Sequence, residues 1–372
     1  MVRKNLFKQS DKEKSVFLDE RYLYPEHLPE VLYHRDKEID SLVYCFDPIL
    51  KGNKPLNVFL AGPTGVGKTV SAKFVLKQLE ENFDRSKSLY LNCFEFNSRA
   101  SVLNAIANFV GAALPRRGLA TDEIFTKMLE SMKKCGFIPI IILDEVDQLL
   151  VSESNSKLLY DLLRVVEYDK HRIGVVMISN DIALTSQLDS RIKSSLAEQT
   201  IIFEPYTPEQ LKAILSERAE LAFEKNAYDK DVVNVAAAHA AKLGGDCRVA
   251  IESLLKAGRI AERENSGKVS LDNLQQAFDS VDAVSLIKGV PHLNNDELTL
   301  VKIISENQLI NSGKIYEIYS KNKNNVLKER RLRDTLSNLE KKNFIFSKQL
   351  NMGNKGKTKE YSSKIPKQFL QG

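Results

Sequence analysis

The chain has 372 residues, of which 43% are hydrophobic and 28% charged, with 17 Gly and 11 Pro. This length predicts more than one hydrophobic core, because single cores stop growing near ~250–300 residues, and the composition excludes a fibrous or disordered chain. The charged N-terminus lacks the apolar stretch of a secretory signal, and the most apolar run, Phe137–Leu143, is far below the ~18 residues of a membrane span. We therefore expect a multidomain cytoplasmic protein without a membrane partner.

Four cysteines are spread along the chain: Cys45, Cys93, Cys135 and Cys247. None forms a Cys-x-x-Cys pair, and no histidine follows at a metal-ligand spacing. Neither a zinc site nor a disulfide framework is indicated. We expect all four to be small core residues in a reducing cytosol.

Positive charge is concentrated at the C-terminal end. Residues 294–372 contain sixteen Lys/Arg and eight Asp/Glu, a net charge of +8, whereas the first 293 residues contain 38 and 41, a net charge of −3. Such asymmetry is typical of a nucleic-acid-binding domain, although a solvated basic face or tail is the alternative.

Short apolar runs alternate with helical patterns in the first two hundred residues, which predicts a parallel α/β sheet. We expect this α/β domain to occupy residues 1–205. The predicted strands are Asn57–Ala61, Ser88–Asn92, Ile138–Leu143, Ile173–Ser179 and Thr200–Phe203.

After Pro205 the strand signal disappears, and we expect a small all-α domain over residues 206–290. A loop around Lys288–Asn295 then leads into a third domain, residues 291–372, with helices and a terminal hairpin. The helices predicted for the all-α domain are Pro208–Glu224, Asp229–Leu243, Arg248–Glu264 and Leu271–Ser280.

The segment after the first strand matches the P-loop pattern G-x-x-x-x-G-K-[ST] and precedes a predicted helix. Glycines allow successive backbone N–H groups to bind phosphate oxygens, Lys68 reaches the β- and γ-phosphates, and the Thr69 hydroxyl is a ligand for Mg²⁺. We therefore expect ATP or ADP and Mg²⁺ as cofactors. The P-loop residues are Gly62, Pro63, Thr64, Gly65, Val66, Gly67, Lys68 and Thr69.

Acidic and amide side chains follow two further strands. Asp144 and Glu145 end the strand Ile138–Leu143, where ligands of open α/β sheets bind, and Asn180 ends the next strand. Asp144 is predicted to hold the metal, and Glu145 to polarise the attacking water. Asn180 is expected beside Asp144, where it would orient that water, although a strand-end Asn that starts a turn is the alternative.

The last domain contains a helix with an apolar stripe and a basic face. Lys328–Lys342 places Leu332, Leu336 and Leu339 on one side, with charged residues opposite. The strands Phe344–Gln349 and Thr358–Ser363 then form a hairpin with a basic tip. A helix followed by such a hairpin is the winged-helix arrangement, and its candidate DNA contacts are Arg330, Arg333, Ser337, Lys355 and Lys357.

These motifs resemble, in their order along the chain, the archaeal replication initiators related to origin recognition complex subunit 1 and cell division control protein 6. Leu143-Asp144-Glu145-Val146-Asp147-Gln148-Leu149 resembles the family's Walker B signature. Asp189–Leu196 with Ile202–Tyr206 resembles its box VII, Gly245-Asp246-Cys247-Arg248 its sensor 2, and Pro115–Phe125 its initiator-specific insertion. The resemblance implies an AAA+ P-loop sheet domain, an α-helical lid and a C-terminal winged-helix domain.

The resemblance also implies roles for single residues. Arg191 would be an arginine finger for nucleotide in a neighbouring subunit, or a surface ion-pair residue. Arg248 would contact the γ-phosphate from the lid. Leu28, Arg35 and Tyr206 would contact the nucleotide, Leu28 and Arg35 from its adenine side, although His34 and Arg35 could also be solvated residues at a helix start.

Arg116 and Arg117 lie in a Pro/Gly-bounded segment within the insertion. They are predicted to contact DNA from the AAA+ domain, with a merely solvated loop as the alternative.

The expected function is ATP-controlled binding of double-stranded origin DNA in the nucleoid, with slow hydrolysis as a switch. The expected partners are the replicative minichromosome maintenance helicase and paralogous initiators on adjacent sites. Two alternatives stay open: another AAA+ loader or remodeller, and a plasmid or viral regulator that binds nucleotide without useful turnover.

Overall fold

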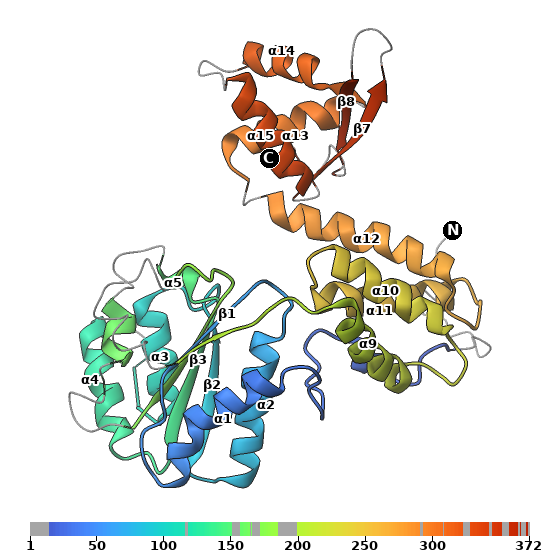
Figure 1. The fold of residues 1–372 in the computed structure, drawn as a ribbon. Coiled ribbons are helices and arrows are strands. Elements are labelled where there is room, and N and C mark those ends of the chain that lie inside the picture. Colours follow the sequence, from blue (N-terminus) through green and yellow to red (C-terminus); the bar gives the residue numbers. More distant parts are fainter. Residues whose placement is uncertain are drawn as a thin grey trace, which may run out of the picture. The chain divides into compact units, whose positions relative to one another are not determined.

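The computed structural model divides into two compact units, Met1–Ser270 and Leu271–Gly372 (Figure 1). Within the described ranges, no helix combines the length and apolar character that a membrane crossing requires. The described residues are 15–115, 118–150, 157–163, 165, 172–184, 199–290, 293–307, 309–322, 328–341, 344–351, 357–363, 365 and 370.

A five-stranded parallel sheet forms the centre of the first unit, in the order β2-β3-β4-β1-β5. Strand β4 therefore lies between β1, which precedes the P-loop, and β3, which ends at Asp144. The predicted α/β class is confirmed, and each predicted strand is present within two residues of its expected ends. The strands are β1 (Val58–Ala61), β2 (Ser86–Asn92), β3 (Ile138–Asp144), β4 (Gly174–Ser179) and β5 (Thr200–Ile202).

Helices cover both faces of this sheet (Figure 1). Side chains alternate along β3, so that Ile140 and Ile142 join the core under α1 and α2, whereas Ile141 and Leu143 join the core under α3 and α4. This explains why β3 is apolar at every position before Asp144, because a strand covered on both faces has no solvent side. The helices are α1 (Asp36–Leu50), α2 (Lys68–Asn82), α3 (Arg99–Phe109), α4 (Thr121–Met132) and α5 (Asp147–Leu150).

The rest of the first unit is helical. Thr207 caps α9 through a capping box with Gln210, and Pro208 occupies the first turn, where its missing N–H costs nothing. The helices α9 (Pro208–Ala222), α10 (Lys230–Lys242) and α11 (Cys247–Arg263) agree with the sequence prediction within two residues.

The N-terminal segment packs on these helices. The Phe17 ring stacks on Phe223 at a centroid distance of 5.0 Å and fills the space left by the absent side chain of Gly258. The 3-10 helix η1 (Glu20–Leu23) follows, and its Glu20 pairs with Arg259 of α11 at 3.0 Å. The sequence pattern did not indicate that this segment belongs with the helical part.

The second unit begins with α12 (Leu271–Gly289). The expected end of this helix at Ser280 was wrong, whereas the expected start of a loop around Lys288 agrees within two residues, because α12 ends at Gly289. No Gly or Pro interrupts residues 281–288, so nothing in the backbone chemistry ends the helix before Gly289.

The remainder of the second unit has the winged-helix arrangement. Leu332, Leu336 and Leu339 of α15 are buried against Ile303 and Tyr361, which confirms the predicted apolar stripe. Strands β6, β8 and β7 form an antiparallel sheet in that order. The elements are α13 (Asn295–Glu306), β6 (Ile310–Asn311), α14 (Ser312–Asn322), α15 (Glu329–Lys341), β7 (Ile345–Asn351) and β8 (Lys357–Ser363).

Candidate nucleotide and DNA sites

The P-loop connects β1 to α2, as the sequence predicts. Gly67 caps α2 with φ +95°, and a Cβ added there would lie 2.6 Å from the Tyr206 hydroxyl, so the position requires glycine. The first turn of α2 contains no acidic residue. Its N-terminus therefore presents backbone N–H groups and the positive end of the helix dipole, which favour an anion.

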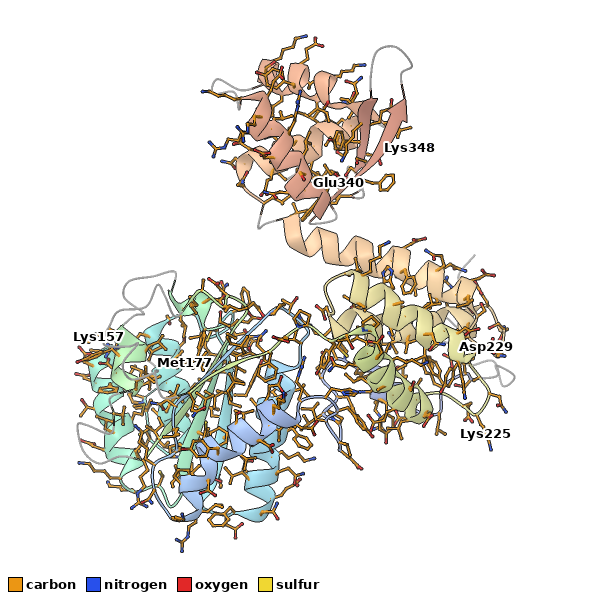
Figure 2. All side chains as sticks on the ribbon, in the orientation of Figure 1. Lys157, Met177, Lys225, Asp229, Glu340 and Lys348 are labelled. Atoms are coloured by element: carbon orange, nitrogen blue, oxygen red, sulfur yellow. The ribbon has the colours of Figure 1, made fainter. Side chains whose placement is uncertain are left out.

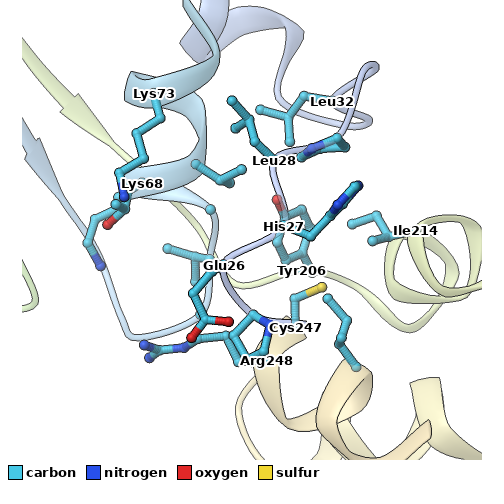
Figure 3. Close-up of a pocket in the computed structure, with 18 of the residues that line it drawn as sticks. Glu26, His27, Leu28, Leu32, Lys68, Lys73, Tyr206, Ile214, Cys247 and Arg248 are labelled. Atoms are coloured by element: carbon cyan, nitrogen blue, oxygen red, sulfur yellow. The ribbon is translucent and has the colours of Figure 1, made fainter. Parts of the chain in front are cut away.

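A pocket of about 360 Å³ opens beside the P-loop, within the size range of small-molecule sites. Figure 3 shows Lys68 of α2 on one side of the pocket and Ile214 and Cys247 of the lid helices on the other side. Leu28 and Leu32, from the segment that precedes α1, also line the pocket. The segment Pro25–Tyr33, called the strap below, supplies much of the apolar lining. The pocket thus combines a phosphate-binding end with an apolar wall, as an adenine nucleotide requires.

Lys68 is only 6% exposed. Its Nζ donates to the carbonyl oxygens of Gly62 at 2.7 Å and Pro63 at 2.6 Å, and to Asn180 Oδ1 at 2.9 Å. Burial lowers the pKa of Lys68, and the carboxylates of Glu145 and Asp144 oppose that shift. These contacts hold the ammonium group at the mouth of the P-loop.

Glu145 and Asn180 meet because β4 lies next to β3. The Asn180 amide nitrogen donates to Glu145 Oε2, while its oxygen accepts from Lys68. Asn180 therefore contacts Glu145 and Lys68, although the sequence placed it beside Asp144. Glu145 has φ +55°, a conformation that costs energy for a non-glycine residue and is often found at functional sites. Burial raises the pKa of its carboxyl group.

The Asp144 carboxylate is 6% exposed and accepts three hydrogen bonds. Thr69 Oγ1 and Tyr90 Oη each donate to Oδ2 at 2.8 Å, and the Glu145 backbone N–H donates to Oδ1 at 3.0 Å. Mg²⁺ prefers oxygen ligands and is usually bound by one or two protein groups together with substrate phosphates. The Thr69 hydroxyl and the Asp144 carboxylate, next to the phosphate site, therefore fit this ion. Among the described residues, no cluster of three His, Cys, Asp or Glu side chains offers a different metal site.

Arg35 is buried, at 4% exposure, so the interpretation of this residue as a solvated helix start is wrong; His34 is exposed. The guanidinium group donates to the backbone oxygens of Val66 at 2.9 Å and Glu204 at 2.7 Å. It also lies 3.8 Å from the centroid of the Tyr206 ring. Arg35 is absent from the pocket lining and instead supports the P-loop backbone, whereas Leu28 and Tyr206 do line the pocket.

The start of α11 brings lid residues to the P-loop. The backbone N–H of Cys247 donates to Gly65 O at 3.1 Å, and Arg248 lines the pocket with a half-exposed side chain. The expectation that Cys247 is a core residue was wrong, since it lines the pocket, and Cys135 is only partly buried; Cys45 and Cys93 are buried. Burial raises the pKa of Cys247 to about 12, so the thiol stays protonated.

In the second unit, the basic face of α15 is exposed as predicted. Arg330, Arg333 and Ser337 are all exposed, and Lys348, labelled in Figure 2, lies on an exposed position of β7. The other predicted DNA contacts, Arg116, Arg117, Lys355 and the side chain of Lys357, lie outside the described residues, as does Arg191, the predicted arginine finger.

Several residues that line the nucleotide pocket were not predicted from the sequence, among them Tyr90 and Lys73. Tyr90 lies two residues before the end of β2, and Lys73 lies one helical turn after Thr69. The available signal for Tyr90 was its position near the end of the predicted strand β2, since the ends of parallel strands meet at one edge of the sheet. The sequence did not show that β2 pairs with β3.

Two family descriptions match the first unit and the start of the second: an AAA domain at residues 53–188 and a Cdc6 AAA+ ATPase-type lid domain at residues 212–279. The fold and the site therefore define an AAA+ ATPase. The ORC1-type DNA replication protein 1 of Sulfurisphaera tokodaii is 33% identical over 93% of this chain and 89% of the relative. The ORC1-type DNA replication protein of Thermococcus kodakarensis is 34% identical over 96% and 90%. The chain belongs to the family of ORC1-type DNA replication proteins.

Solved structures agree with this assignment. The Aeropyrum pernix ORC1 protein, determined in complex with DNA, has a TM-score of 0.72 and 31% identity, covering 97% of this chain and 96% of that chain. Cdc6p from Pyrobaculum aerophilum shares the fold with a TM-score of 0.66 at 20% identity, covering 96% and 98%.

Proposed function

We propose that this protein is an ATP-dependent initiator of DNA replication, which binds double-stranded origin DNA and helps to recruit the replicative helicase. The observation that carries the proposal is the convergence of Lys68, Asp144, Glu145 and Asn180 in one pocket faced by Arg248 of the lid. The names of the relatives and the DNA complex of the Aeropyrum pernix protein support the DNA-binding part.

In this proposal the P-loop and Lys68 bind the ATP phosphates, and Thr69 and Asp144 hold Mg²⁺, which neutralises phosphate charge when it is bound. Glu145 polarises the attacking water, and Asn180 fixes the Glu145 carboxylate through the observed amide contact. Hydrolysis acts as a slow switch. Arg191 is proposed to act on nucleotide in a neighbouring subunit.

The lid is proposed to couple nucleotide state to domain angle. Arg248 contacts the γ-phosphate, Leu28 and Tyr206 contact the nucleotide on the side of the base, and Arg35 acts indirectly through Val66. We propose domain limits of 1–205, 206–290 and 291–372 for the AAA+, lid and winged-helix domains.

DNA binding is proposed to use two kinds of contact. In the winged-helix domain, Arg330, Arg333 and Ser337 enter the major groove, while Lys355 and Lys357 contact the phosphate backbone. In the AAA+ domain, Arg116 and Arg117 form a second contact. The minichromosome maintenance helicase and paralogous initiators on adjacent sites are the proposed partners, with the protein acting at the nucleoid in the cytoplasm.

Single-turnover hydrolysis of radiolabelled ATP, with and without duplex origin DNA, tests the proposal. Glu145→Gln should bind ATP but hydrolyse it at least about 100-fold more slowly, because a positioned general base contributes ~10²–10⁴-fold. Glu130→Gln, an exposed change on α4, is the control and should match the wild type. Wild-type hydrolysis no faster than that of Glu145→Gln would favour the alternative, a regulator that binds nucleotide without turnover.

A further inference from the structure

Tyr90 connects β2 to the carboxylate that ends β3. These strands pair in parallel with Asn92 opposite Asp144, which places Tyr90 two residues from the end of the ladder. Its phenol oxygen donates to Asp144 Oδ2 at 2.8 Å, across 54 residues of sequence. Tyr90 belongs to none of the motifs identified above.

Each bond to Asp144 comes from a different part of the fold. Thr69 donates from the start of α2, the Glu145 N–H donates from the residue that follows β3, and Tyr90 donates from β2. Thr69 is itself a proposed metal ligand, and the Glu145 N–H is fixed by the chain. Tyr90 is therefore the side chain that can orient the carboxylate without also binding the metal.

Lys73 holds the phenol ring in place. Its ammonium group lies 3.8 Å from the centroid of the Tyr90 ring, within the range of a cation–π contact. Both side chains line the pocket.

We propose that Tyr90 is a positioning residue that orients Asp144 for Mg²⁺. Its hydroxyl fixes Oδ2 of the carboxylate, so that Asp144 does not have to change its orientation when the metal binds. This inference rests on the proposed ATPase function of the same pocket. Partners of this kind typically change metal affinity by 10–100-fold when they are removed.

The test measures Mg²⁺ binding separately from nucleotide binding in the full chain. The affinity for a fluorescent non-hydrolysable ATP analogue is measured in EDTA, and Mg²⁺ is titrated into a separate sample of the complex in metal-free buffer without chelator. Tyr90→Phe keeps the ring and its contact with Lys73 but loses the hydroxyl. It should raise the Mg²⁺ concentration at half-saturation about 10-fold and change the affinity in EDTA by less than about twofold.

Tyr319→Phe is the matched control, because Tyr319 donates a similar phenol-to-carboxylate bond, to Asp296 at 2.6 Å, in the second unit. It should leave both measurements unchanged. An unaltered Mg²⁺ midpoint in Tyr90→Phe, or an equal loss of affinity in EDTA, would overturn the inference, and so would an equal shift in Tyr319→Phe. A wild-type chain whose analogue binding is independent of Mg²⁺ would overturn the proposed magnesium site itself, and so the two failures are distinguishable.

Discussion

Basic side chains lie at the P-loop beside the nucleotide pocket and on the exposed face of α15, but in opposite environments. Lys68 and Arg35 are 6% and 4% exposed and donate to fixed backbone oxygens. The Arg333 side chain is 72% exposed, and its ion pair with Glu329 spans 3.5 Å on the helix surface. Buried charges are costly unless every bond is made, whereas exposed pairs contribute little and are screened by salt. The pocket should therefore respond to geometry, and the helix face to charge and ionic strength.

The largest effect is expected from Lys68→Ala. This change removes a charged group at the phosphate site and should weaken ATP binding at least about 100-fold, because charge-assisted hydrogen bonds are about twice as strong as neutral ones. Isothermal titration calorimetry measures the affinity. Lys77→Ala, which removes an exposed lysine of the same helix that pairs with Glu81, is the control and should bind ATP normally. An equal loss of ATP affinity in the two variants would contradict the expected difference between the buried Lys68 and the exposed Lys77.

Arg35→Lys should have the next largest effect, although it conserves charge. Lysine cannot reproduce a planar fork that bonds Val66 O and Glu204 O while stacking on Tyr206, and we expect a loss of about 2 kcal/mol in the free energy of unfolding. Denaturant titration of the full chain measures it. Arg21→Lys, at a residue whose side chain is 77% exposed, is the control and should change stability by less than about 0.5 kcal/mol. Equal stability of the two variants would show that the Arg35 contacts are not structural.

On the helix face, Arg330→Ala combined with Arg333→Ala should lower DNA affinity about 10-fold. It should also flatten the slope of log affinity against log salt by up to ~2 if both residues meet phosphates, or by less if they contact bases. Fluorescence anisotropy at several salt concentrations distinguishes these cases. The control is Lys225→Ala with Lys230→Ala, which removes two exposed lysines of the first unit. A slope and affinity equal to the wild type would place the DNA contact elsewhere.

The smallest effect is expected from His27, which lines the pocket from the strap. Burial, followed by the charge of Arg218, lowers the pKa of His27 below its usual 6.5. As the pH falls through 6.5, the unfolded chain therefore takes up this proton before the folded chain does, and stability decreases until the lower folded-state pKa is passed. His27→Gln should slightly reduce the drop in melting temperature between pH 7.5 and pH 5.5. An identical drop in melting temperature in the wild type and in His27→Gln would contradict the lowered pKa of His27 in the folded chain.

Local sequence signals predicted the elements and the motifs that lie on them. The P-loop is recognisable because its glycines and Lys68 are contiguous, and α15 because Leu332, Leu336 and Leu339 repeat at the helical period. The end of α12 was placed too early at Ser280, although Val281, Val284 and Ile287 continue the helical spacing and no Gly or Pro intervenes before Gly289.

By itself, the sequence determined the order of strands and helices, the phosphate-binding loop, Asp144 and Glu145 at a strand end, and the basic C-terminal end, because each depends on residues close together in the chain. Tertiary structure alone decided that Arg35 supports Val66 and that Tyr90 bonds Asp144. Those contacts join residues 31 and 54 positions apart. They follow from strand order and side-chain packing, and no local periodicity encodes either.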